Sequence, residues 1–241
     1  MLKYLQAENL KFKRTFLKKL IFIAPIVPLL FGFMTGKYFE QNSFNEWYMM
    51  ILPGYISIMA VMTNEKDQKK LRYRAVFGLP ISLKKIWISK VLVNGIYMTF
   101  SCMVFIVGIF LGSYLRITPI SAFSAFAGAG LIAVTSLWQI PLCMFLAKKL
   151  GMLGTVLINV GVGTVLNVMA VKTSMWWISP YSWTTRIMCP ILGILPNGEL
   201  AGIGDSLRNP VVIPIGTILS IILFVLLLIV TANWFKKQEV N

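Results

Sequence analysis

Long apolar runs separated by basic segments dominate the pattern of this chain. A helix that crosses the roughly 30 Å hydrocarbon core of a bilayer needs about 20 mostly apolar residues. Six runs of about that length contain no Asp or Glu: Leu20–Gly36, Trp47–Thr63, Ile86 or Val91 to Gly112, Ala122–Ala147, Met152–Val171 and Val211–Trp234. The pattern therefore predicts an all-α integral membrane protein with six transmembrane helices in one domain, residues 1–241.

The positions of lysine and arginine predict the orientation, because these residues collect on the cytoplasmic side of membrane proteins. Most of them lie in residues 1–19, in residues 64–90, after the fourth run and at the carboxyl terminus. The opposite side keeps only Lys37, Arg116, Lys172, Arg186 and Arg208. Both termini are therefore expected in the cytoplasm, and residues 172–209 form the longest outer loop.

The composition agrees with this class and excludes several others. The chain is 57% apolar and 13% charged, whereas soluble domains are about 45–50% apolar and about 25% charged. The net charge of +15 is explained by topology and by anionic lipid headgroups, so no nucleic-acid binding is expected. Histidine is absent and the three cysteines are widely spaced, so neither a catalytic residue nor a metal site is expected.

The chain also lacks a visible energy source of its own. Ion-coupled transporters usually carry ionisable groups at membrane depth, and no Asp or Glu lies in the middle of an apolar run. The Gly-x-x-x-x-Gly-Lys-Ser/Thr phosphate-binding loop is missing as well. If the protein transports a substrate, another subunit must supply the energy.

The amino-terminal segment, residues 1–19, has the character of a basic amphipathic helix. Leu2, Leu5, Phe12 and Phe16 fall roughly on one helical face, and lysines occupy much of the remainder. Such a helix lies in the headgroup plane with its apolar side in the membrane. We expect an interfacial helix here, and a simple basic flank of the first span is the alternative.

Residues 64–85 form a charged cytoplasmic loop that also contains apolar and aromatic residues. They predict a short helix from about Lys66 to Phe77, ended by Gly78 and Pro80, with Ser82 capping the next helix. This helix would offer aromatic side chains and charges to a soluble partner. A loop that only sets the topology is the alternative.

Three amides lie inside the later spans: Gln139, Asn159 and Asn167. They have two interpretations. They either line a route for an amphiphilic substrate, or form interhelical hydrogen bonds, which contribute about 0.6 kcal/mol each. The second explanation is the simpler one.

The outer loop, residues 172–209, is rich in aromatic residues and contains an apolar patch at residues 191–195 that is too short to span the bilayer. A helical hairpin or re-entrant segment, half sunk in the outer leaflet, fits this pattern. An ordinary aromatic belt at the interface fits it too. The residues that would handle a substrate at this surface are Trp176, Trp177, Tyr181, Trp183 and Arg186.

The layout resembles the permease subunits of ABC-2-type exporters over essentially the whole chain. Besides the six spans, the resemblance rests on LPISLKKIWISK at residues 79–90. Two further stretches, YLQAENLKFKRTF at residues 4–16 and ISPYSW at residues 178–183, are similar to the lantibiotic-immunity permeases of Gram-positive bacteria, the MutE/EpiE/NisE and MutG/EpiG/NisG group.

This resemblance implies a complex in the cell membrane made of two related permeases and two copies of an ABC ATPase subunit. ATP and magnesium would bind to the ATPase, so this chain would be neither an enzyme nor a cofactor carrier. The complex would expel cationic antimicrobial peptides from the membrane. The resemblance also places ATPase coupling in the loop after the second span, at Glu65, Asp67, Lys69, Arg72, Tyr73, Arg74, Phe77, Gly78, Leu79 and Pro80.

Three other functions remain open. One is an ABC-2 permease for another drug or lipid, and another is a membrane scaffold or sensor that does not transport. An intramembrane enzyme is the most remote, because histidine and acids at membrane depth are missing.

Overall fold

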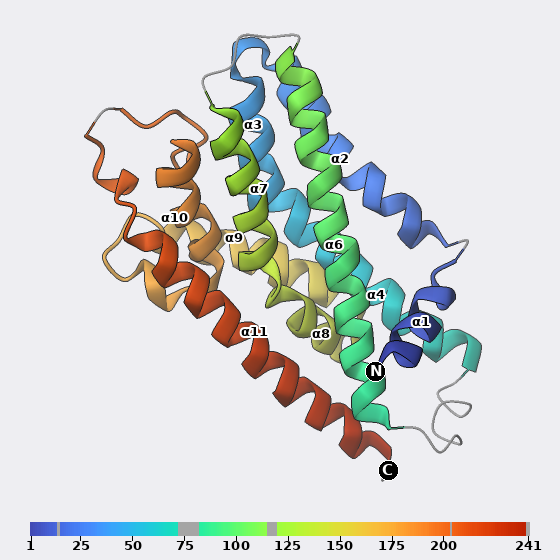
Figure 1. Cartoon of the computed structure of the whole chain (residues 1–241). Helices are drawn as coiled ribbons and strands as arrows, with labels where there is room; N and C mark the ends of the chain where they lie inside the picture. The colour runs from blue at the N-terminus through green and yellow to red at the C-terminus, as the bar shows by residue number, and fades with distance from the viewer. Residues whose placement is uncertain (14, 72–81, 115–119, 203, 240–241) are drawn as a thin grey trace.

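The computed structural model is a bundle of helices (Figure 1), and it describes all residues except 14, 72–81, 115–119, 203 and 240–241. The helices are α1 (Leu2–Lys11), α2 (Phe16–Met34), α3 (Phe39–Glu46), α4 (Leu52–Leu71), α6 (Leu83–Tyr114), α7 (Ala122–Ser136), α8 (Gln139–Val156), α9 (Gly163–Ala170), α10 (Pro180–Leu192) and α11 (Val212–Lys236). Extended pairing in the described part is limited to one isolated antiparallel bridge, Ile194–Leu200. The all-helical prediction is therefore confirmed.

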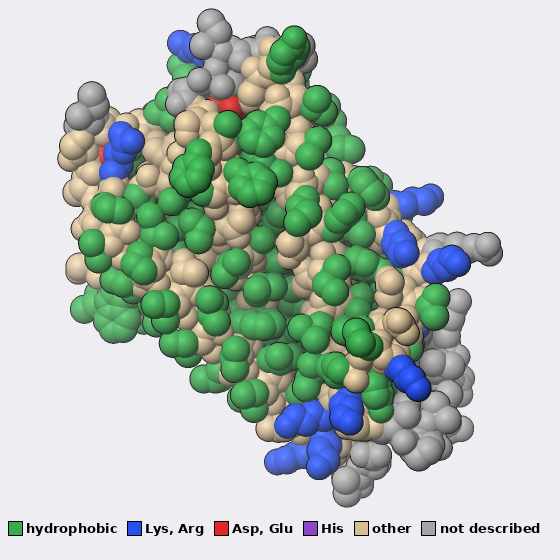
Figure 2. Space-filling view, viewed as in Figure 1, with side chains coloured by type: hydrophobic (Ala, Val, Ile, Leu, Met, Phe, Trp, Pro, Cys, Tyr) green, Lys and Arg blue, Asp and Glu red, His purple; other side chains and the backbone are tan. Residues whose placement is uncertain are grey.

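By length and composition, four helical segments of the described chain could cross a membrane: α2, α6, the stretch from Gln139 to Ala170, which folds back on itself at Gly151, and α11. Apolar side chains cover the middle of the face in Figure 2, while lysines and arginines lie near its ends. The amino terminus and the carboxyl terminus both lie in the lower half of the bundle in Figure 1. A membrane-embedded bundle is thus established, and the count of six spans stays a prediction.

The predicted second span lies inside a helix that runs from Phe39 to Leu71 without a break. Between α3 and α4, residues Trp47–Ile51 form a π-helical turn, η2, in which the Leu52 N–H donates to the Trp47 carbonyl. Pro53 follows directly and has no N–H to donate, so the α-helical ladder cannot continue regularly at this point. The apolar run is therefore the middle of a longer helix with polar ends.

The predicted fourth span is not one helix, which corrects the sequence analysis. The chain leaves α7 at Ser136, turns through residues 137–138 and enters α8 at Gln139. Pro141 has no N–H for the Leu137 carbonyl, which accepts instead from Ile140 three residues later. An apolar run of sufficient length was predicted as one span, although its proline sits where a new helix begins.

The chain reverses direction at Gly151, inside the stretch that includes α8. Gly151 has φ +69°, which is the left-handed region that favours glycine. Gln139 and Asn159 would be about 30 Å apart in a straight helix, yet their side chains are 3.1 Å apart. Two helical arms therefore lie side by side, joined just after Lys148 and Lys149, where the sequence placed the turn.

Helix α6 lies at the centre of the packing and contacts α1, α2, α7 and α11. Its Phe105 ring stacks on Trp47 at 5.1 Å between centroids, and Phe44 meets the same ring edge-on. A Cβ at Gly32 of α2 would overlap the Ser43 hydroxyl of α3, so these helices cross at their closest there. The core therefore holds α6 against the helix from Phe39 to Leu71.

Candidate functional site at the coupling end and the polar seam

The predicted coupling residues begin inside α4. Glu65, Asp67 and Lys69 all belong to its last two turns. The expected separate helix from Lys66 is therefore wrong at its start, because the strong helix formers of residues 65–71 simply extend α4. The remaining coupling residues lie outside the described part of the chain: Arg72, Tyr73, Arg74, Phe77, Gly78, Leu79 and Pro80.

On the other side of the loop, α6 begins at Leu83. The Ser82 hydroxyl accepts from the Lys85 N–H at 3.4 Å, as the predicted cap. The helix that contains the predicted third span therefore begins before both possible starts, Ile86 and Val91, and the membrane boundary itself stays a prediction. Lys90, which the sequence analysis assigned to the loop, lies inside α6 and is 2% exposed.

A buried ion pair clamps α1 onto α6 beside this loop. Glu8 is 4% exposed, and its Oε2 lies 3.5 Å from the Lys90 Nζ. Its other oxygen accepts a hydrogen bond of 2.7 Å from Lys11. Charges this far from water are tolerated when they are paired. We call Glu8, Lys11 and Lys90 the α1 clamp.

Other contacts of α1 correct its predicted apolar face. Phe12 packs edge-on against Tyr97 of α6 at 5.8 Å, and the Tyr97 hydroxyl donates to Asn9. Leu2 and Phe16, however, are exposed. Helix α1 ends at Lys11, so Phe16 belongs to α2 and does not share its periodicity. The sequence offered one signal for the clamp, since Glu8 is the first acid in a strongly basic segment.

Asn159 is the centre of the first polar cluster within the bundle. Its Nδ2 donates to the Pro53 carbonyl at 3.0 Å, to the Ser57 hydroxyl at 3.2 Å and to Gln139 Oε1 at 3.1 Å. The Asn159 Oδ1 is buried and has no hydrogen-bond partner among the described residues. The two arms that meet at Gly151 are thus tied both to each other and to α4.

Asn167 forms a second cluster further along the same helix boundary. Its Nδ2 donates to the Thr185 hydroxyl of α10 at 2.9 Å and lies 2.8 Å from the Met49 sulfur of η2. We call Met49, Pro53, Ser57, Gln139, Asn159 and Asn167 the polar seam. All three predicted amides make interhelical hydrogen bonds in it, and a role in a substrate route stays a prediction.

The polar seam lies where the helices depart from regular geometry on both sides. One side holds η2, and the other holds a second π-helical turn, η3 (Leu157–Val162), which contains Asn159. Turns of this kind occur frequently at functional sites. Sequence reasoning missed Met49, Ser57 and Thr185, because their types are ordinary in apolar helices and only their spatial neighbours distinguish them.

The aromatic residues of the outer loop are mostly buried within the protein, and their expected placement at a membrane interface stays a prediction. Trp176 and Trp183 pack with Val212 in a small cluster, and the Trp183 Nε1 donates to the Trp177 carbonyl at 2.9 Å. Trp177 differs from these two tryptophans, because it is 50% exposed. The rings are buried because α10 packs against α7, α9 and α11.

Tyr181 of α10 packs against the bundle, whereas Arg186 reaches the short helical turn Ser206–Arg208 in the following loop. The Tyr181 ring meets Trp138 edge-on at 5.0 Å, and a Cβ at Gly163 would lie 2.6 Å from that ring. Arg186 is buried and donates to the Leu207 carbonyl. These residues therefore hold α10 in place, and sequence reasoning missed Trp138 because it sits at the break between α7 and α8.

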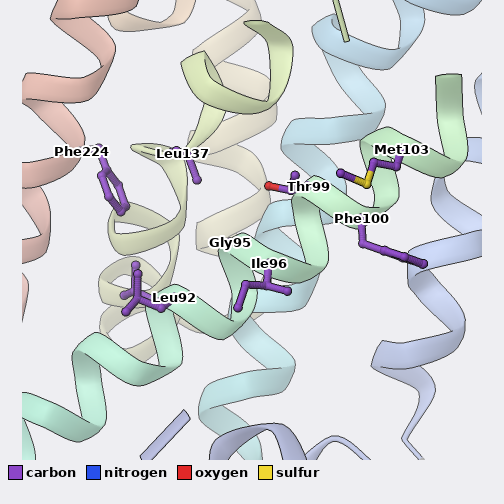
Figure 3. Close-up of a pocket in the computed structure, with 9 residues that line it drawn as sticks. Leu92, Gly95, Ile96, Thr99, Phe100, Met103, Leu137 and Phe224 are labelled. Atoms are coloured by element: carbon purple, nitrogen blue, oxygen red, sulfur yellow. The ribbon is translucent and has the colours of Figure 1, made fainter. Parts of the chain in front are cut away.

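Two grooves lie at different levels of the molecule. The groove in Figure 3 has a volume of about 400 Å³, and Thr99 is its one side chain with a hydroxyl, among apolar residues of α6, Leu137 and Phe224. The second, of about 380 Å³, lies between the start of α3 and the loop after α10 and is lined by Tyr38, Gln41, Asn42, Asn197, Gly198, Glu199 and Leu200. We call this second one the outer polar groove, after the side of the membrane on which the sequence predicts it.

Comparison with known proteins gives one family. A family model described as ABC-2 family transporter protein matches residues 13–197, well over half of the chain. No curated protein and no solved structure matches the chain.

Proposed function

The chain belongs to the ABC-2 family of transporter proteins, and from this premise we propose that it is a permease subunit of an exporter driven by a separate ATPase. Membership makes it a transmembrane component of an ABC transporter without catalytic activity of its own. One observation supports a driven permease: the unbroken helix from Phe39 to Leu71 joins the polar seam to the charged loop that follows.

This helix gives the ATPase a direct mechanical path into the membrane. Ser57 of the polar seam and Leu71 at the end of α4 are about 20 Å apart along the helix. A push on residues 72–81 would therefore move α4 as a rod against α8 and η3. The hydrogen bonds of the amide side chains in the polar seam can exchange partners, which would allow a second packing of the bundle to which ATP binding could switch it.

The α1 clamp extends the movement to the amino-terminal helix. Helix α6 begins soon after the loop, and Lys90 is its eighth residue. A shift of this end of α6 would therefore move Glu8 and α1 with it. In this proposal six spans cross the membrane, both termini are cytoplasmic, and a second permease and two ATPase copies complete the exporter.

For the substrate we propose a cationic antimicrobial peptide of the lantibiotic type, lifted from the outer leaflet of a Gram-positive cell membrane. The resemblance of residues 178–183 supports it, together with the half-exposed ring of Trp177. The outer polar groove adds the Glu199 carboxylate and several amides, which suit a peptide backbone and a cationic side chain. Transport of another amphiphile and a non-transporting scaffold are the competing outcomes.

The coupling assignment is tested by replacing Phe77 and Leu79 together with Asp. We expect the variant to reach the membrane but to lose co-purification of the ATPase, because carboxylates replace the apolar contacts in the ATPase groove. Leu2→Asp is the matched control, since Leu2 is an exposed apolar residue on α1. Stoichiometric retention of the ATPase by the double variant would contradict the assignment, and ATP-driven export by this chain without any ATPase would overturn the proposed function.

The substrate assignment is tested with Trp177→Ala in a peptide-sensitive strain that carries the complete transporter. We expect about a ten-fold loss of tolerance to lantibiotic peptides, because one stacking or apolar contact contributes about 1–1.5 kcal/mol. Ile178→Ala is the control, since Ile178 is equally open and adjacent but not aromatic. Unchanged tolerance in the Trp177 variant would remove this ring from peptide handling.

A further inference from the structure

A basic hollow lies at the end of the bundle, where α8 meets the end of α11. It has a volume of about 490 Å³ and is lined by Lys149, Trp234, Lys237 and Gln238. Figure 2 shows lysine or arginine side chains gathered at the lower end of the molecule, directly below a surface of apolar side chains. This hollow plays no part in the coupling loop, the polar seam or the outer loop.

The charge around the hollow is strongly positive. The two chain segments that form it, residues 145–149 and 234–239, contain the four lysines Lys148, Lys149, Lys236 and Lys237 and one acid, Glu239. Aromatic rings hold two of the cations: the Lys148 Nζ lies 4.4 Å from the centre of the Phe235 ring, and the Lys149 Nζ lies 5.5 Å from that of Trp234. Rings that fix the ammonium groups in place reduce the entropy lost when an anion binds.

Trp234 is itself held in a defined orientation. Phe145 meets its ring edge-on at 4.7 Å, and Trp87 does so at 5.9 Å. Its remaining surface faces the hollow. A fixed indole at the border between an apolar surface and a group of lysines is the usual arrangement at a membrane interface.

The apolar side of the site continues along α11. Val230 and Leu226 lie one and two turns before Trp234 on the same helix face, and both are about half exposed. A ligand anchored at the lysines can therefore extend hydrocarbon along this stripe. Lysines beside an apolar stripe fit a molecule that has both an anionic head and apolar tails. A soluble anion and an acidic protein surface both lack such tails.

We infer that the hollow is a binding site for an anionic phospholipid. The phosphate of the headgroup lies between Lys149 and Lys237, Gln238 hydrogen-bonds to the polar part of the head, and an acyl chain follows Trp234, Val230 and Leu226. Basic hollows between transmembrane helices recognise such headgroups elsewhere. The inference needs only a membrane protein, so it does not depend on the proposed peptide export.

The test uses the purified full chain in neutral detergent and short-chain phosphatidylglycerol as the probe, with binding followed by native mass spectrometry. Lys149→Gln combined with Lys237→Gln is expected to weaken binding about 30-fold, since each lysine near a headgroup contributes about a five-fold effect. Lys18→Gln combined with Lys19→Gln removes the same charge from the start of α2 and should change binding less than about two-fold. Lys149→Arg with Lys237→Arg should keep it, which separates lost charge from misfolding.

Two competing probes distinguish the source of the phosphate. Short-chain phosphatidylcholine and inorganic phosphate should each compete at least about ten-fold more weakly than phosphatidylglycerol. Equal competition by inorganic phosphate would show an anion site without lipid character and overturn the inference. Equal losses in the two double glutamine variants would also overturn it, as would unchanged lipid binding in the Lys149 and Lys237 variant.

Discussion

Helices α6 and α11 are both long, apolar and close to each other, yet the bundle uses them in opposite ways. In their most apolar stretches, 44% of α6 is buried but only 17% of α11. The buried face of α6 contains the polar residues Ser89, Lys90, Asn94 and Ser101. The open face of α11 consists of branched aliphatic side chains such as Ile218, Ile222 and Val225.

The difference follows from the surroundings of each helix. Polar side chains in a bilayer must find partners inside the protein, so they gather on the helix that has neighbours on most sides. Asn94, for example, accepts from the Thr63 hydroxyl at 3.0 Å and donates to the Lys90 carbonyl at 3.0 Å. Helix α11 offers lipid an apolar surface, and its interactions with the bundle concentrate at its ends.

Among the tests of this contrast, the substitution Lys90→Met in α6 has the largest expected effect. The change removes the buried ammonium beside Glu8 and leaves the carboxylate paired with Lys11. Removal of one partner from a buried ion pair costs up to about 3–5 kcal/mol. We expect a clearly lower thermal unfolding temperature in detergent, measured by near-ultraviolet circular dichroism. Glu8→Gln combined with Lys90→Met should recover most of the loss, and a double variant as unstable as the single one would show that the α1 clamp is not the cause.

A smaller effect is expected where α6 meets the end of α11. The Trp87 Nε1 donates to the Thr231 hydroxyl at 2.9 Å, and its ring stacks on Phe235 at 4.7 Å. Trp87→Phe keeps an aromatic ring but loses the hydrogen bond, so the free energy of unfolding should fall by about 1–2 kcal/mol. The same unfolding measurement checks it, and a loss as large as that for Lys90→Met would contradict the difference between buried charge and buried hydrogen bond.

The smallest effect is expected on the open face of α11. Ile222→Ala removes methyl groups that face away from the bundle, so the free energy of unfolding should change by less than about 0.5 kcal/mol. Ile106→Ala in α6 is the matched change at a buried site and should cost about 2–5 kcal/mol. Comparable losses for the two variants would indicate that another protein surface, and not lipid, covers α11.

Much of the architecture is readable along the chain. The apolar runs near α2, α6 and α11 predict helices at the correct places, and Ser82 marks the start of α6. The prolines were harder to interpret. Pro53 lies beside a π-helical turn in a continuous helix, whereas Pro141 coincides with a break between two helices. The same missing N–H has different outcomes, because the neighbouring helices decide whether the chain bends or ends.

The candidate site shows the same division. Gln139, Asn159 and Asn167 stand out as amides in apolar runs, but their common partners on η2 and α4 are distant in sequence. Trp176 and Trp183 have the composition of an interface belt, yet they are buried against the start of α11. Residue type predicted that these positions matter to packing or to a substrate, while the identity of each contact needed the folded chain.

The sequence by itself determined that this is a basic, helical membrane protein, because hydropathy and charge act locally and need no knowledge of neighbours. Only the tertiary structure decided that Glu8 meets Lys90, that Asn159 joins three helices and that Trp234 borders a basic hollow. Such pairings depend on where the chain reverses and how closely its helices approach. Those features arise from the packing of the whole bundle and leave no periodic signal in the sequence.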